Sequence, residues 1–162
     1  MRRVITGVGP DGASVVVSDE ELPVVAPGTI GVSVSILGGA DDLPFELPHS
    51  GVFEHRPTFM PGPGGLRIQR VSVEPGEMSG RGSPLADGGD APAEAEISDE
   101  GYHQTATVDI LFVIKGRIGM LLDDEEVEVG EGDCLIQFGP MHAWRNRGEE
   151  VAEVGLVILG AR

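Results

Sequence analysis

The sequence predicts an all-β fold, an antiparallel β-barrel, and two observations support this prediction. The 25 glycines and 12 prolines leave few windows long enough for a helix. Short apolar runs alternate with turn-forming sequences such as residues 9–12 (GPDG). With 162 residues, of which 40% are hydrophobic, the chain can bury one core, so we expect a single domain over residues 1–162.

The predicted strands are short runs of valine, isoleucine and other apolar residues between turns. In chain order they cover residues 15–17, 30–37, 66–73, 110–114, 118–122, 134–138 and 154–159. Residues 1–64 combine the first two strands with an irregular arm over residues 38–64, where phenylalanines are scattered among prolines. Residues 65–162 form the predicted barrel core, in which we expect to find Phe112 and Trp144.

Residues 79–100 form an insert of different composition, rich in glycine, proline, alanine and acidic residues. So few large apolar side chains cannot offset the ordering cost of about 1 to 2 kcal/mol per residue. We therefore expect an exposed, mobile loop that contributes little to stability. Its position in the chain suits a lid over the barrel mouth.

The charge of the chain argues against two classes of partner. Its 27 acidic residues exceed its 11 lysines and arginines, which gives a formal net charge of −16. Such a field repels nucleic-acid phosphates and anionic membrane surfaces, so we expect neither as a partner. The sequence has neither a signal-peptide pattern nor an apolar segment of about 18 residues, and we expect a cytoplasmic protein. The single cysteine, Cys134, excludes an internal disulfide and is most simply a small core residue.

The candidate site residues come from a polar row in the C-terminal half. His49 and His55 lie in the irregular arm, where we interpret them as surface histidines. If residues 103–109 were extended, His103, Thr105, Thr107 and Asp109 would share one face, because side chains alternate along a strand. Such a row faces either solvent or a wet cavity.

Two sets of positions resemble the two sequence motifs of the cupin superfamily. They are His103, Thr105, Asp109 and Gly116 for the first motif, and Gly132, Phe138, Gly139, His142 and Asn146 for the second. A turn at residues 75–76 (PG) resembles the one that precedes the first motif. The surrounding residues are similar to those of small bacterial and fungal cupins, some of them oxidoreductases of polyketide pathways. This resemblance implies a jelly-roll β-barrel and, by analogy with small cupins, a homodimer.

The resemblance also implies a divalent metal ion, Fe, Mn, Ni or Zn, held by His103, Asp109 and His142. Thr105 stands where the family motif has another histidine, and a hydroxyl is a poor ligand for such metals. Tyr102 is a candidate catalytic acid at the rim of the barrel. Residues 15–17 and 30–37 are apolar strands that could supply the dimer contact at a sheet edge.

Two functions remain open. The first is a metal-dependent enzyme, an oxidoreductase or lyase of secondary metabolism, that acts on a small organic molecule. The second is a non-catalytic cupin that binds a small ligand or a structural metal, and Thr105 in place of a ligand histidine favours it. The fold identifies no substrate, because cupins host many chemistries.

Overall fold

Eleven β-strands and no helix occur in the part of the chain that the computed structural model describes, residues 2–9, 12–23, 32–41, 43, 49, 51, 59–76, 78–79 and 101–161. The strands are β1 (Arg2–Val8), β2 (Ser14–Glu21), β3 (Val32–Ala40), β4 (Leu66–Val73), β5 (Met78–Ser79), β6 (Thr107–Lys115), β7 (Arg117–Leu121), β8 (Glu126–Gly130), β9 (Cys134–Gln137), β10 (Ala143–Arg145) and β11 (Ala152–Gly160). Among these residues there is accordingly no helix long and apolar enough to span a bilayer.

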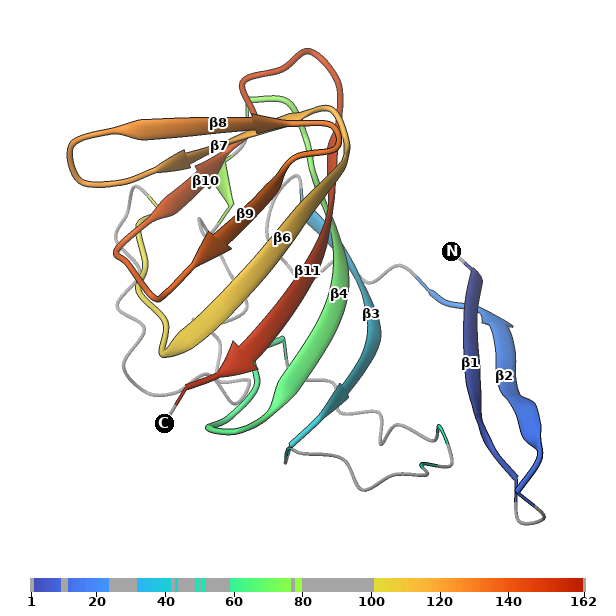
Figure 1. Ribbon diagram of the computed structural model, residues 1–162. Helices are drawn as coiled ribbons and strands as arrows, with labels where there is room; N and C mark the ends of the chain where they lie inside the picture. Colours follow the sequence, from blue (N-terminus) through green and yellow to red (C-terminus); the bar gives the residue numbers. More distant parts are fainter. Residues whose placement is uncertain are drawn as a thin grey trace.

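The strands form two sheets and a separate hairpin, and all their pairings are antiparallel (Figure 1). One sheet has the order β3-β4-β11-β6-β9, and the other has the order β5-β10-β7-β8. The hairpin of β1 and β2 stands beside β3, away from the smaller sheet (Figure 1). The prediction of an all-β, antiparallel fold is therefore confirmed, with two sheets that resemble a jelly roll rather than one continuous barrel wall.

The core lies between the two sheets, where strands such as β4 and β6 bury every second side chain. β4 alternates strictly, so that Val71 and Val73 are buried while their neighbours are partly exposed. Leu111 and Val113 of β6, and Ile118 and Met120 of β7, complete this inner face together with Trp144 of β10. Trp144 is thus a core residue, as predicted.

The same alternation corrects two predictions for the core. Leu111 and Val113 point inward, so Phe112 between them points outward and is 51% exposed. Cys134, which pairs with Phe112 across β6 and β9, is also exposed. Neither residue belongs to the core, because the direction of an alternating strand depends on which face meets the second sheet.

Each predicted strand corresponds to an observed one, although β1, β5, β8 and β10 are not among the predicted runs. β8 contains Glu126 and Glu128, and acidic residues are depleted in strands. Here both carboxylates are exposed and bind arginines: Glu126 accepts two hydrogen bonds from Arg147, each of 2.6 Å, and Glu128 accepts one from Arg117 at 3.1 Å. Interactions with other segments thus stabilise a strand that its composition disfavours.

The predicted irregular arm starts too early, because residues 38–40 continue β3. Most of the rest of the arm, including His55, lies outside the described residues, as do residues 80–100 of the insert. His49 is described and is half-buried, and its Nδ1 accepts a hydrogen bond of 2.9 Å from the backbone N–H of Gly51.

Candidate functional site

His103 and His142 come together through their backbones. The N–H of His103 donates to the carbonyl oxygen of His142 at 2.8 Å, and the N–H of His142 donates to that of His103 at 3.0 Å. This isolated antiparallel bridge lies just before β6 and β10. Directly opposed residues in an antiparallel pair project to the same side, and the ring centroids of the two histidines are 4.4 Å apart. The structure thus joins the two histidines predicted from the sequence motifs.

Both imidazoles present an unprotonated Nε2. Nδ1 of His103 lies 3.0 Å from the carbonyl oxygen of Gly101, and Nδ1 of His142 lies 2.9 Å from that of Pro140. A carbonyl oxygen only accepts hydrogen bonds, so each Nδ1 carries the proton and each Nε2 of the neutral ring has a lone pair. This arrangement is typical of metal-binding histidines, whose second nitrogen donates to a backbone carbonyl or carboxylate.

Burial keeps both rings neutral. It lowers the pKa of His142 to about 4, with a further lowering by the repulsion that protonated His103 would exert, while the hydrogen bond to the carbonyl oxygen of Pro140 opposes the change. Burial also lowers the pKa of His103, against the opposing effects of Gly101 and Asp109. At neutral pH two uncharged imidazoles therefore lie side by side, in the protonation state that a metal or a hydrogen-bonding ligand requires.

The predicted polar row turns inward. Thr105, Thr107 and Asp109 are all buried, and the hydroxyl groups of Thr105 and Thr107 form a hydrogen bond of 2.8 Å. Burial raises the pKa of the Asp109 carboxyl, while Thr107, Gln137 and the charge of His103 lower it in part. Its Oδ1 atom is buried and has no hydrogen-bond partner. The row thus ends in a carboxyl group that is only partly satisfied and protonates more easily than usual.

Gln137 connects this row to the histidines. The pairing of β6 with β9 places Gln137 opposite Asp109. Its Nε2 donates to Oδ2 of Asp109 at 2.5 Å and lies 3.3 Å from Nε2 of His142. Motif spacing alone did not single out this residue. Its position two residues after the partly buried Leu135 could have indicated an inward side chain, but not its partner.

A cavity of about 70 Å³ lies against these residues. His103, Thr105, Asp109 and His142 form its polar wall, and the remaining wall is mainly apolar, with Leu111, Ile118, Trp144 and Ile158 among its side chains. A cavity of about 150 Å³ accommodates benzene, so this space admits only a small group. The polar row therefore faces a cavity rather than bulk solvent.

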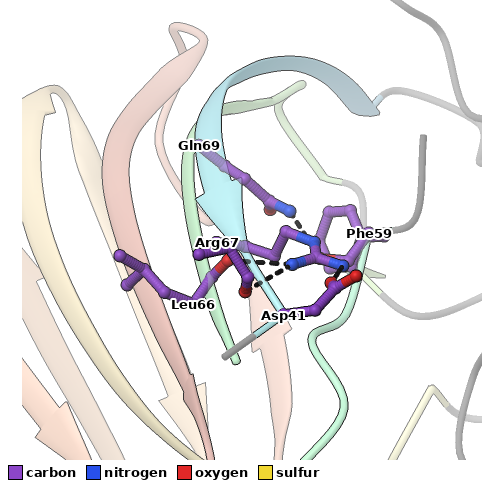
Figure 2. A network of polar contacts seen from close by, with 6 residues as sticks. Asp41, Phe59, Leu66, Arg67 and Gln69 are labelled. Carbon is purple, nitrogen blue, oxygen red and sulfur yellow. Dashed lines mark hydrogen bonds and ion pairs between the residues drawn. The ribbon is translucent and has the colours of Figure 1, made fainter. Parts of the chain in front are cut away.

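A second buried polar network lies on β4, where Figure 2 shows Arg67 and Gln69. The Arg67 guanidinium donates to the carbonyl oxygens of Ala40 and Leu66 at 3.2 and 2.9 Å, and to Asp41 at 3.1 Å. Gln69 donates to the carbonyl oxygen of Phe59 at 2.5 Å. These bonds attach β4 to β3 and to the segment at Phe59, which lines the same cavity. No sequence pattern indicated that these polar side chains would lie inside the fold.

One of the three predicted metal ligands, Asp109, does not join the two histidines in a metal-binding geometry. No three histidine, cysteine, aspartate or glutamate side chains within the described residues are grouped as a metal site requires. His103 and His142 are adjacent, but Asp109 is hydrogen-bonded to Gln137. Tyr102 is half-buried next to His103 and is not among the described residues that line the cavity, so its role as a catalytic acid stays a prediction.

Comparison with known proteins identifies the fold. No protein-family model matches the sequence, and no curated protein is similar to it. Among solved structures, the cupin domain of Cnp3 from Schizosaccharomyces pombe aligns with a TM-score of 0.53 and 10% identity, over 98% of this chain and 87% of that one. The polyketide cyclase RemF from Streptomyces resistomycificus aligns with a TM-score of 0.51 and 14% identity, over 86% and 74% of the two chains. The chain has the cupin fold, which confirms the fold that its two sequence motifs predicted.

Proposed function

We propose that this protein is a cupin enzyme that acts on a small organic molecule in the cavity beside His103 and His142, and that it depends on a divalent metal ion. The observation that carries the proposal is the pair of neutral imidazoles, each fixed by a backbone carbonyl so that its Nε2 lone pair is available. A histidine that serves only the core has no need of an adjacent histidine in the same tautomer. A pair of this kind is typical of a metal centre.

The donor atoms suit such a metal chemically. His103 and His142 would supply two imidazole nitrogens, and Asp109 would supply Oδ1, which has no hydrogen-bond partner. Two imidazoles and one carboxylate suit Fe, Mn, Ni or Zn and leave positions for water and substrate. In the present geometry Asp109 is held by Gln137, so its participation requires a change in that contact.

The chain's own side chains account for substrate binding and proton transfer. A bound metal ion would act as a Lewis acid or as a site of O₂ activation. Leu111, Ile118 and Trp144 line the cavity with apolar surface that excludes water from the polar wall. When no metal is bound to it, Asp109, whose pKa is raised by burial, can hold a proton next to a ligand.

The alternative is a non-catalytic cupin that binds a small ligand, and the Gln137 network favours it. Gln137 already donates a hydrogen bond to Oδ2 of Asp109 and contacts His142. The cupin fold is compatible with either function, since RemF is a cyclase whereas the Cnp3 domain is described only as a cupin. We expect the protein in the cytoplasm, where the exposed thiol of Cys134 would stay reduced.

Metal analysis of the purified protein tests the proposal. We expect the wild-type protein to retain a divalent metal and to bind added Co²⁺, and His103→Ala and His142→Ala to lose this binding while the β-sheet circular dichroism is kept. His49→Ala is the matched control, because His49 is not among the described residues that line the cavity. Turnover of small aliphatic compounds, with and without a chelator, separates the enzyme from the ligand-binding alternative. Metal binding unaffected by both cavity substitutions would refute the proposed site.

A further inference from the structure

Gln137 makes contacts that a metal ion in this site would have to replace. The side chain is buried, with 4% of its surface exposed. Its single amide nitrogen lies 2.5 Å from Oδ2 of Asp109 and 3.3 Å from Nε2 of His142. One amide group thus contacts two of the three side chains proposed as ligands.

The neighbours of the amide fix its orientation. Nδ1 of His142 is protonated because it donates to Pro140, so Nε2 of the neutral ring is an acceptor. The carboxylate of Asp109 is an acceptor as well. If the amide were flipped, its oxygen would face two acceptors, and both contacts would become repulsive. The two hydrogens of the amide nitrogen therefore point to Asp109 and His142.

We propose that Gln137 competes with the metal ion for Nε2 of His142 and holds the Asp109 carboxylate in place through Oδ2, an inference that rests on the proposed metal site. The lone pair of His142 Nε2 that accepts the amide hydrogen is the one that a metal would use. A cation must therefore displace the amide before it can bind both side chains. Oε1 of Gln137 is buried without a hydrogen-bond partner, so no bond at that atom holds the amide in place.

Substitution of Gln137 tests this competition through metal affinity, without any assay of activity. The leucine side chain of Gln137→Leu has a similar volume but makes no hydrogen bonds. We expect this variant to bind Co²⁺ about 10- to 100-fold more tightly than the wild type. This range corresponds to the loss of a hydrogen bond to a charged group. Gln137→Asn keeps the amide but shortens the side chain, and it should also bind Co²⁺ more tightly even if the leucine variant folds poorly. Dissociation constants come from titration of metal-free protein with Co²⁺, followed by visible absorption.

Gln69→Leu is the matched control, because Gln69 is a fully buried glutamine of the other network, hydrogen-bonded to Phe59 (Figure 2). Its substitution should leave the Co²⁺ affinity unchanged. If the wild type binds Co²⁺ and both Gln137 variants bind it equally or more weakly, the proposed competition is wrong. The proposed metal site is not contradicted by that result. If Co²⁺ binds to the Gln137 variants but not to the wild type, the competition is supported. The native function then does not depend on a metal ion. If no protein binds Co²⁺, both ideas are wrong.

Discussion

His103 and His142 are held together by two reciprocal backbone hydrogen bonds of 2.8 and 3.0 Å. These bonds set the distance between the imidazoles without any direct bond between the side chains. The loop before His142 contributes a third contact, since Gln104 donates to the carbonyl oxygen of Gly139 at 2.8 Å. The site therefore depends on the backbone packing of two loops as much as on the identity of its side chains.

Gly139→Ala should disturb this packing. Gly139 has a φ of +62°, and a Cβ added there would lie 2.6 Å from the carbonyl oxygen of Thr105. Gly132→Ala is the control, because Gly132 has a φ of +88° but no atom within 4 Å of an added Cβ. Both variants carry a backbone strain of about 1 to 2 kcal/mol. Only Gly139→Ala should lose about 1 to 3 kcal/mol more in urea unfolding and bind Co²⁺ more weakly. Equal losses in the two variants would contradict the contact.

The motif residues could be predicted from the sequence because their information is local. Alternation along an extended segment places Thr105, Thr107 and Asp109 on one face, and the structure shows that this face is buried. The spacing of His103 and His142 relative to the turns was informative through its resemblance to the cupin motifs. The two histidines are adjacent because of an isolated β-bridge, which no local sequence pattern predicts.

The contacts of Gln137 could not be predicted, because they depend on the register between β6 and β9. A shift of that register by one residue would turn Gln137 away from the cavity. The same limit explains the error at Phe112, whose direction depends on which face of β6 meets the second sheet. Alternation reveals which residues share a face, whereas pairing between distant strands decides what that face meets.

Gly160→Ala should destabilise the end of β11. A Cβ at Gly160 would lie 1.9 Å from the carbonyl oxygen of Gly62, and the backbone of Gly160 is hydrogen-bonded to Gly64 and Gly65 at 3.0 and 2.9 Å. The clash is with main chain, which cannot turn away as a side chain can. We expect a loss of at least about 1 to 3 kcal/mol in the free energy of unfolding. Gly62→Ala, where an added Cβ meets nothing within 4 Å, should be close to neutral. A neutral Gly160→Ala would show that the two loops do not pack as described.

We expect a homodimer that pairs through the outer face of β6 and β9. Phe112, Ile114, Ile136 and Phe138 are exposed there, with Phe138 79% exposed. A chain with a formal net charge of −16 associates with itself most readily through an uncharged face, and a two-fold axis would bring this face against its own copy. Sedimentation velocity at micromolar concentration should show a dimer for the wild type.

Ile136→Lys should produce a monomer, because it places a charge at the centre of this face. Val16→Lys should remain dimeric, since Val16 lies on the separate hairpin and is equally open to substitution, with 62% of its surface exposed. The converse result would assign the dimer contact to residues 15–17, which the sequence indicated as one pairing edge. A monomeric wild type would contradict both assignments.

Acidification should destabilise the protein as the pH falls below 6.5, because burial depresses the pKa of His142 from 6.5 to about 4. Between these two values the unfolded chain binds the proton and the folded chain does not, so the free energy of unfolding decreases as the pH decreases, by up to about 3 kcal/mol. His103 contributes with the same sign, whereas the raised pKa of Asp109 opposes the loss at the acidic end, since the folded state then holds an extra proton. Urea unfolding at about pH 7.5, 6.5, 5.5 and 4.5 measures the slope of the free energy of unfolding against pH. His142→Gln, which cannot titrate, should show a smaller slope than the wild type, and Asp109→Asn a larger one at the acidic end. Identical slopes in the wild type and His142→Gln would mean that His142 is not held neutral by burial in the folded protein.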